Sequence, residues 1–385
     1  MSPVEDCPHR PTCPGCPRFG ARDLPAKAWS TLDRIAAAAG LPEPSVHRAP
    51  ARGHRHRARL AVRGRARSPK IGLFQVDSHR IVDIPRCPVH HPLINDAAQR
   101  IRAAIRETGI EPYADRPHRG ALRYVQLVVE RRTERIQVVL VGRGATRDVL
   151  GALPEAVCDQ LGDRLQGLFF NGQPERSNAI LGPTTVRLAG EAATRESIGG
   201  VEVFFPPDAF GQNHLPLFER AVSRVGSLVP PGRTIAEAYC GVGAIGLGLL
   251  SNAKAIRFNE RSPGGLRGLE LGLAARPEAE RARATIVAGT AGEELALLDG
   301  ADAVIVDPPR RGLDALLREA LAQRPPDRLV YLACGLDALE ADLDRLVRPG
   351  GLTLCGIEAF DFFPFTEHVE VLAWLDRDGE HSRAK

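Results

Sequence analysis

The chain has 385 residues, of which 43% are hydrophobic, so it is long enough for two or more domains with their own cores. No apolar run approaches the roughly 20 residues of a membrane span, and the opening MSPVEDCPHRPTCPGC lacks the apolar core of a signal peptide. We therefore expect a cytoplasmic protein that has no membrane partner.

The net charge of +4 is distributed unevenly along the chain. Residues 1–200 carry 31 Lys and Arg against 20 Asp and Glu, whereas residues 201–385 carry 20 against 27. This split predicts a basic, anion-binding front half joined to an acidic back half. The excess of 47 Arg over 4 Lys is equally typical of a biased genome, which leaves a solvated basic surface as the alternative.

Three cysteines open the chain with a spacing typical of a metal site, Cys7-x5-Cys13-x2-Cys16, and prolines turn the chain between them. Cys87, with His90 and His91 beside it, is the candidate for a fourth ligand. Because a cytoplasmic setting disfavours disulfides, we expect these thiols to bind metal. Four thiolates hold either tetrahedral zinc or a [4Fe–4S] cluster, and the spacing does not distinguish the two.

A dense basic run, ARGHRHRARLAVRGRARSPK, occupies residues 51–70 and contains seven Arg, one Lys and no acid. In a strand or hairpin, Arg63, Arg65 and Arg67 would share one face. Guanidinium groups bind phosphate in a bidentate manner, so the run predicts contact with nucleic acid. Only 5% of the residues are aromatic, which argues against an extended base-stacking platform.

After about residue 205, short β-rich runs alternate with helical patterns, which predicts an α/β domain with a parallel sheet covered on both faces. In such sheets, ligands bind beyond the carboxyl ends of the strands. Seven strands are expected, at residues 234–240, 255–260, 284–290, 301–309, 328–334, 352–360 and 367–375.

The first of these strands runs into a glycine turn, Gly241-x-Gly243-x-x-Gly246, and the second ends in Glu260. A glycine turn followed by an acid at the next strand end predicts a cofactor that contains adenosine, either a nicotinamide dinucleotide or S-adenosylmethionine (SAM). Glu237 favours SAM, because a dinucleotide site has no use for a negative charge near its pyrophosphate.

Two further strand ends carry candidate chemistry. Asp307 ends the fourth strand in VIVDPPRRGLD, where two prolines stiffen the exit. It is either an exposed acid in a rigid loop or a carboxylate presented to a planar base, and we favour the second. Cys334 ends the fifth strand in LVYLACG. A cysteine at this place is either a small packing residue or a nucleophile in a ligand site.

Together these motifs resemble the RNA uridine-C5 methyltransferases, which make 5-methyluridine with SAM. The resemblance covers nearly the whole chain and is closest to the iron–sulfur branch that modifies bacterial 23S ribosomal RNA and has no TRAM domain. The segments that carry it are HRHR (54–57), DAFGQ (208–212), YCGVG (239–243), DPPRRGL (307–313), YLAC (331–334) and FPFTEHVE (363–370).

The resemblance implies three regions. Residues 1–95 would form an iron–sulfur and basic RNA-binding region, and residues 96–205 a central β-rich RNA-binding domain, which together make an α+β region. Residues 206–385 would form a class I SAM-dependent methyltransferase, Rossmann-like with a seven-stranded sheet. The implied partner is RNA, with 23S ribosomal RNA favoured over transfer RNA, and the implied state is a monomer without an obligate protein partner.

The resemblance also implies roles for single residues. Cys334 would add to uracil C6, and Glu370, the last residue of FPFTEHVE, would remove the C5 proton. The implied ligands of a [4Fe–4S] cluster are Cys7, Cys13, Cys16 and Cys87. The implied SAM-binding residues are Gln212, Tyr239, Gly241, Gly243, Glu260 and Asp307.

The chain departs from the family pattern at five places in or near these motifs, one of which is Asn213-His214 in place of a Val-Asn pair. Ala244 and Gly272 stand where asparagine is usual, and Thr290 stands where an acid is usual, which predicts weaker SAM binding. Gly335 replaces the asparagine that usually follows the nucleophile.

Two other functions are compatible with parts of the sequence. An iron–sulfur oxidoreductase could bind a nicotinamide dinucleotide at GVGAIG, but it leaves Asp-Pro-Pro-Arg and Cys334 without a role. A non-catalytic RNA-binding relative would explain the changes at Ala244 and Thr290, but it leaves Cys334 and Glu370 without a role.

Overall fold

The computed structural model describes residues 7–347 and 350–378, which form two compact units. Unit 1 contains the described residues up to Gly20 together with Pro50–Glu196 and Phe205–Leu215. Unit 2 contains Ala21–Ala49, Ser197–Phe204 and the described residues from Pro216 onward. Each unit is thus assembled from separate stretches of the chain. The division by function at residues 95 and 205 stays a prediction.

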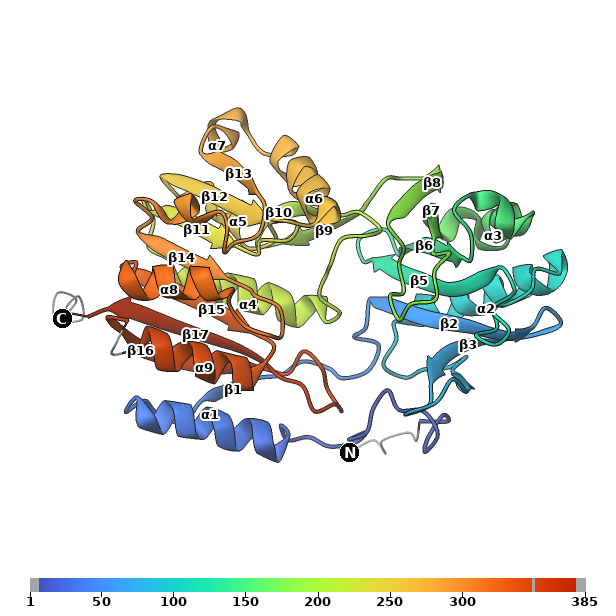
Figure 1. The fold of residues 1–385 in the computed structure, drawn as a ribbon, viewed down its shortest axis with the longest axis horizontal. Coiled ribbons are helices and arrows are strands. Elements are labelled where there is room, and N and C mark those ends of the chain that lie inside the picture. Colours follow the sequence, from blue (N-terminus) through green and yellow to red (C-terminus); the bar gives the residue numbers. More distant parts are fainter. Residues whose placement is uncertain (1–6, 348–349, 379–385) are drawn as a thin grey trace. The chain divides into compact units, whose positions relative to one another are not determined.

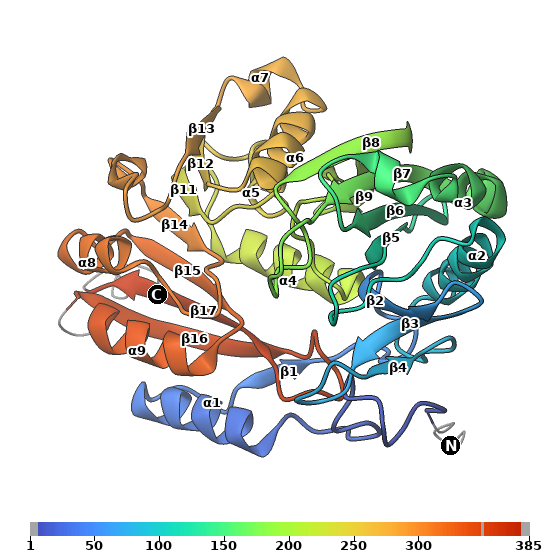
Figure 2. The same ribbon diagram turned by 45° about the vertical axis from the view of Figure 1, so that its right-hand side comes forward.

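Unit 1 is built on a seven-stranded sheet in the order β4-β3-β2-β5-β6-β7-β8, in which only β6 and β7 are parallel neighbours. Its strands are β2 (Arg57–Arg65), β3 (Ser68–Phe74), β4 (Ile81–Asp83), β5 (Leu122–Glu130), β6 (Arg135–Gly142), β7 (Leu165–Gly172) and β8 (Thr184–Gly190). The helices α2 (Pro92–Thr108) and α3 (Leu153–Leu161) share one hydrophobic core with this sheet and lie side by side (Figure 2). The short helices η1 (Arg147–Leu150) and η2 (Gly162–Arg164) flank α3.

The basic run at residues 51–70 forms the β2–β3 hairpin, as predicted, with Arg65 paired to Ser68. Ala58, Leu60 and Val62 alternate into the core under the helices, so Arg63 and Arg65 lie on the opposite face of β2. The expectation that Arg67 shares this face is wrong, because Arg67 lies in the two-residue turn of the hairpin.

Unit 2 contains an eight-stranded sheet in the order β1-β16-β17-β15-β14-β11-β12-β13 (Figure 1). Its strands are β1 (Ser45–His47), β11 (Thr234–Ala238), β12 (Ala255–Glu260), β13 (Ala284–Ala288), β14 (Ala303–Val306), β15 (Arg328–Ala333), β16 (Leu352–Phe360) and β17 (Glu370–Arg377). All seven predicted strands are present. The predicted number is wrong by one, because the three residues of β1 pair with the end of β16 and are too few to produce a periodic signal.

Helices cover both faces of the sheet in unit 2, as predicted. On one face, α1 (Ala26–Ala38), α8 (Ala315–Gln323) and α9 (Leu336–Leu346) share a core with the central strands. On the other face, α4 (Leu215–Leu228) packs on β16 and β17. There Arg224 Cζ lies 4.9 Å from the Trp374 ring centroid, and Arg224 Nε donates to Glu358. The remaining elements are β9 (Thr194–Ile198), β10 (Val201–Phe205), α5 (Gly246–Leu249), α6 (Pro263–Ala274), α7 (Glu278–Arg281) and η3 (Leu295–Leu298).

The sheet of unit 2 is not wholly parallel. β17 runs antiparallel to both of its neighbours, β15 and β16. The first residue of β17 therefore lies at the edge where the parallel strands end. Within the described residues, no helix is both long enough and apolar enough to cross a membrane.

Candidate active site

Four neighbouring strands of unit 2 bring predicted functional residues to one edge of the sheet. Glu237 lies on β11, Asp307 follows β14, Cys334 follows β15, and Glu370 begins β17. The last residue of β15 pairs with the second residue of β17, so the antiparallel register places Cys334 opposite Glu370. Residues that are far apart in the sequence thus meet at the carboxyl edge, where α/β sheets bind their ligands.

Glu370 is a buried carboxyl group that lacks partners. Its side chain is 1% exposed, and neither Oε1 nor Oε2 has a hydrogen-bond partner among the described residues. Burial raises the pKa of Glu370 well above its ordinary value, the charge of Asp307 raises it further, and Arg310 opposes both. A buried polar group without partners destabilises a fold, and such groups concentrate at functional sites.

Cys334 lies within the electrostatic reach of the same residues. Burial raises the pKa of its thiol to about 11, the charges of Glu370 and Asp307 add to this, and Arg310 lowers it. Burial also raises the pKa of Asp307 to about 7. In the free protein the thiol is therefore protonated at neutral pH, next to two carboxyl groups that resist ionisation.

Arg310 is a site residue to which sequence analysis gave no role. It is the cation that lowers the pKa of both Cys334 and Glu370. The signal was present, since Arg310 directly follows the two prolines of the Asp307 motif. A Cβ at Gly335 would lie 2.5 Å from the carbonyl oxygen of Arg310, so the loop that carries this arginine passes over the residue after Cys334. This close approach accounts for glycine at position 335.

Asp342 on α9 fixes the loop that follows Asp307, and sequence analysis missed it. Its carboxylate is 2% exposed and accepts hydrogen bonds from the Tyr331 hydroxyl at 2.7 Å, the Leu313 amide at 2.9 Å and Arg318 Nη1 at 3.0 Å. The loop, the strand that ends at the cysteine and α8 are thereby tied to one anion. The sequence alone gives no hint of this, because Asp342 is an ordinary acid in a helical pattern.

The predicted cofactor loop and its acid are neighbours in the structure. The Gly241 amide donates to Glu260 Oε2 at 2.8 Å, and Glu260 Oε1 accepts from the amides of the next two residues. Positive φ angles at Tyr239 (59°), Gly241 (57°) and Gly243 (76°) give the loop its tight turns. The Tyr239 hydroxyl also accepts from the Asp314 amide at 2.9 Å, which links this loop to the one after Asp307.

Glu237 is a second buried carboxyl group with an unsatisfied oxygen atom. Its side chain is 2% exposed, and Oε2 has no hydrogen-bond partner within the described part of the chain. Burial raises the pKa of Glu237 to about 8, and the charge of Asp307 adds to the increase. A Cβ at Gly246 would collide with this carboxylate, so the third glycine of the loop makes room for it.

Besides Gly335, two departures from the family pattern have structural reasons. A Cβ at Gly272 would lie 2.5 Å from Cδ1 of Leu247, because α6 approaches α5 closely at this point. The Thr290 hydroxyl donates to Glu293 at 2.5 Å, so an acid is present three residues after the position where the family usually has one. Ala244 is buried in the loop, and nothing in the structure explains why alanine occurs there.

Gln212 belongs to unit 1, unlike the other predicted SAM-binding residues. It is 8% exposed and lines a small cavity with Arg57 and Glu196, whereas nearby Phe210 is 69% exposed. Arg57 Nη1 donates to the carbonyl oxygen of Ala209 at 2.8 Å, which holds the segment that carries Gln212. A contact between Gln212 and a cofactor stays a prediction.

The four predicted metal ligands also lie in unit 1 and are free, half-buried thiols. Burial raises the pKa of Cys16 to about 12, and the charges of Cys87, Cys13 and Cys7 raise it further, so all four thiols interact. Asn95, which sequence analysis missed, fixes the backbone of Cys87 through two hydrogen bonds. Its Oδ1 accepts from the Cys87 amide, and its Nδ2 donates to the Cys87 carbonyl oxygen. Among the described residues, however, no three His, Cys, Asp or Glu side chains are arranged to hold a metal ion.

Comparison with known proteins gives consistent results. The profile of the tRNA (uracil-5-)-methyltransferase family matches residues 295–378. An uncharacterized RNA methyltransferase of Protochlamydia amoebophila is 33% identical, with 96% of this chain and 97% of that relative covered. A second, from Gloeobacter violaceus, is also 33% identical over 97% of this chain and 84% of its own length.

Among solved structures, the chain resembles the tRNA (uracil-54, C5)-methyltransferase of Pyrococcus abyssi, crystallised with S-adenosyl-L-homocysteine. The two are 26% identical with a TM-score of 0.77, and the match covers 97% of this chain and 87% of that chain. Because a relative is 33% identical along nearly the whole length of the chain, the chain belongs to the RNA methyltransferases of the uracil-5 family.

Proposed function

We propose that the protein uses SAM to methylate C5 of a uracil in RNA and so forms 5-methyluridine. The observation that carries the proposal is Cys334 opposite a buried Glu370 at the carboxyl edge of the sheet. Membership of the uracil-5 family supports the reaction class and argues against the oxidoreductase alternative.

The reaction needs a nucleophile and then a base. Uracil C5 is a weak nucleophile, and addition of the Cys334 thiolate to C6 converts the ring to an enolate whose C5 is electron-rich. SAM, when bound, supplies the methyl group. Glu370 then takes the C5 proton, and the electrons of that C–H bond restore the C5–C6 double bond as the thiolate leaves. The product is 5-methyluridine, and Cys334 is regenerated.

The protonation states in the free protein define what the residues must do. Cys334 must lose its proton, and Arg310 is the group that favours the thiolate. Glu370 must be ionised when the C5 proton leaves, and its raised pKa makes its carboxylate a strong base. Asp307 opposes both ionisations and, in our proposal, binds the uracil or the cofactor instead.

The loop residues of unit 2 suit a SAM site. Glu237 has a buried carboxylate oxygen without a partner, which fits the ammonium group of the amino-acid end of SAM. Glu260 at the end of β12 would bind the ribose hydroxyls, and Gly241 and Gly243 would let the backbone approach the ligand closely. Tyr239 and Asp307 complete the set that we propose in unit 2, and Gln212 of unit 1 is proposed from the family resemblance alone.

We also propose that Cys7, Cys13, Cys16 and Cys87 bind a metal centre, with a [4Fe–4S] cluster favoured over zinc. The charges of Cys87, Cys13 and Cys7 all act on the pKa of Cys16, which supports a site shared by the four thiols, and metal binding would require them to lose their protons. Methyl transfer requires no electrons, so the centre would fix the shape of unit 1 rather than take part in the reaction.

The target RNA is proposed as 23S ribosomal RNA, on the resemblance to the iron–sulfur branch. The family profile and the Pyrococcus abyssi enzyme are both named for transfer RNA, which makes transfer RNA the second candidate.

One assay tests the reaction and the two candidate targets together. Protein purified without oxygen is incubated with SAM and with unmodified transcripts of ribosomal or transfer RNA. The RNA is then digested, and 5-methyluridine is quantified by mass spectrometry. We expect product with the wild type and with Cys355→Ala, a matched cysteine in β16, but none with Cys334→Ala. Equal product from Cys334→Ala would remove the nucleophile from the proposal.

A further inference from the structure

Unit 1 contains a large pocket that none of the proposed catalytic, cofactor or metal residues lines. The cavity measures about 610 Å³, within the range of sites for small ligands. It is formed by β2, the β3–β4 turn, the loop before β5, the start of β5 and the loop between β7 and β8.

Two buried arginines form a rigid floor for this cavity, which we call the arginine pocket. Arg63 is 6% exposed and Arg123 is 2% exposed. The ring of Tyr113, itself 2% exposed, contacts both, with its centroid 5.0 Å from Arg63 Cζ and 4.7 Å from Arg123 Cζ. Such cation–π contacts, together with hydrogen bonds to backbone carbonyls, hold both guanidinium groups in place.

The charge of the pocket is strongly positive. Four arginines line it against one acid, Asp115, and both oxygens of this carboxylate bind Arg63 at 3.0 and 3.3 Å. Arg123 binds only carbonyl oxygens, and its Nε has no partner in the described part of the chain. The pKa of nearby His118 is lowered by desolvation and by the charges of Arg176, Arg143 and Arg123. The positive field is therefore not neutralised within the pocket.

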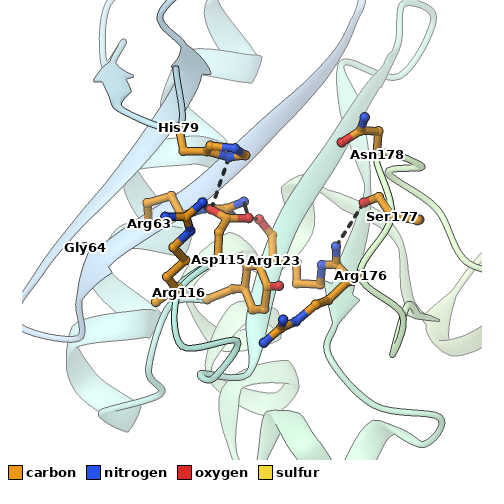
Figure 3. Close-up of a pocket in the computed structure, with 11 residues that line it drawn as sticks. Arg63, Gly64, His79, Asp115, Arg116, Arg123, Arg176, Ser177 and Asn178 are labelled. Atoms are coloured by element: carbon orange, nitrogen blue, oxygen red, sulfur yellow. Dashed lines mark hydrogen bonds and ion pairs between the residues drawn. The ribbon is translucent and has the colours of Figure 1, made fainter. Parts of the chain in front are cut away.

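The rim of the pocket is exposed and carries groups that can bind a nucleotide. Arg116, Arg176, His79 and Asn178 are all exposed, and neither rim arginine has a carboxylate partner among the described residues. Figure 3 shows Arg63 and His79 on one side of the cavity and Ser177 and Asn178 on the other. Guanidinium groups bind phosphate and stack on bases, while amide and hydroxyl groups read base edges.

We propose that the arginine pocket holds one nucleotide of the RNA substrate, other than the methylated one, with its phosphate on the arginines and its base in the cavity. This inference rests on the proposed function, because it takes RNA as the ligand. The exposed rim lets a strand enter and leave, which suits a nucleotide within a chain. The two buried arginines are already held in place in the free protein, so little entropy is lost when the nucleotide binds.

The test changes only the exposed rim. In the pocket variant Arg116→Glu/Arg176→Glu, both substituted side chains are exposed, so we expect the fold to be retained. The control variant Arg106→Glu/Arg147→Glu makes the same change of net charge at exposed residues of α2 and η1 in the same unit. RNA affinity is measured by fluorescence anisotropy at several KCl concentrations, on transcripts of both target classes.

The pocket variant should bind RNA at least about 10-fold more weakly than the control variant. Its slope of log affinity against log salt should fall by about 0.7 to 0.9 for each lost phosphate contact. Equal weakening in the two variants would overturn the proposal, because only net charge would then matter.

A second arm distinguishes RNA from a free nucleotide. Uridine 5′-monophosphate is titrated calorimetrically into the wild type and the pocket variant. Loss of this binding with RNA affinity unchanged would overturn the proposal in favour of a free-nucleotide site. Neither arm requires methyl transfer, so an enzyme that binds RNA through the pocket yet forms no 5-methyluridine refutes the proposed reaction and leaves the pocket standing.

Discussion

Replacing Glu237 by glutamine should alter how the stability of the protein depends on pH. Burial raises the pKa of Glu237 from 4.5 to about 8 in the folded protein. Between these values the folded state binds more protons than the unfolded state, so the free energy of unfolding falls as pH rises. The loss amounts to about 1.4 kcal/mol per pH unit and to roughly 5 kcal/mol in total.

The variant Glu237→Gln lacks this ionisation, so its free energy of unfolding should decrease less steeply with pH. Asp307 and Glu370, whose pKa values are also raised, contribute to the slope in both proteins, so the difference between the two curves is the quantity to measure. Urea unfolding at pH 5, 6, 7 and 8 should show the variant gaining about 3.5 kcal/mol on the wild type across the series.

The matched control is Glu43→Gln, which changes an exposed glutamate of the same unit and should leave the slope unchanged. Parallel curves for the wild type and Glu237→Gln would refute the reasoning, since they would mean that Glu237 is ionised in the folded protein at every pH tested.

Three further substitutions test other parts of the account. Gly335→Ala places a methyl group 2.5 Å from the Arg310 carbonyl oxygen. Methyl transfer should therefore fall at least about 10-fold, while the SAM affinity measured by calorimetry stays within about twofold. Unchanged turnover would contradict the close approach. Asp342→Ala removes the buried acceptor of the Leu313 amide and the Tyr331 hydroxyl, so the free energy of unfolding in urea should fall by about 3–5 kcal/mol. The exposed control Asp344→Ala should lower it by less than about 0.5 kcal/mol. Equal losses would refute the role of Asp342. Cys16→Ser should abolish the iron or zinc bound per chain, measured by plasma mass spectrometry after anaerobic purification, whereas Cys158→Ser should not; metal retained by Cys16→Ser would exclude it as a ligand.

Local sequence patterns were sufficient to predict the sheet of unit 2 and the strand ends of the site. The runs that end at Asp307 and Cys334 are apolar and short, and glycine or proline marks each exit, so their strands and tips were recognisable. Glu370 was predicted as the base from the family resemblance, not from the strand pattern. The antiparallel direction of β17, which the expected parallel sheet did not include, brings it to the same edge as Cys334.

The features that escaped sequence analysis depend on contacts between distant segments. β1 is recognisable only by its pairing with β16, about 310 residues further along the chain. Asp342 becomes a fixed point only when α9 packs beside the loop after Asp307. The arginine pocket joins the basic hairpin to loops near residues 115 and 177, which carry no periodic pattern. Of the residues that line it, sequence analysis had singled out only Arg63.

The most direct test of the central claim is to look for the covalent intermediate itself. If Glu370 removes the C5 proton after Cys334 has added to C6, then Glu370→Gln can add and methylate but cannot eliminate. With SAM and the substrate RNA, this variant should accumulate a methylated RNA–protein adduct, detected by denaturing electrophoresis and by mass spectrometry of the peptide that contains Cys334. The double variant Cys334→Ala/Glu370→Gln should form no adduct. An adduct on another residue, or release of methylated RNA by Glu370→Gln at the wild-type rate, would contradict the account.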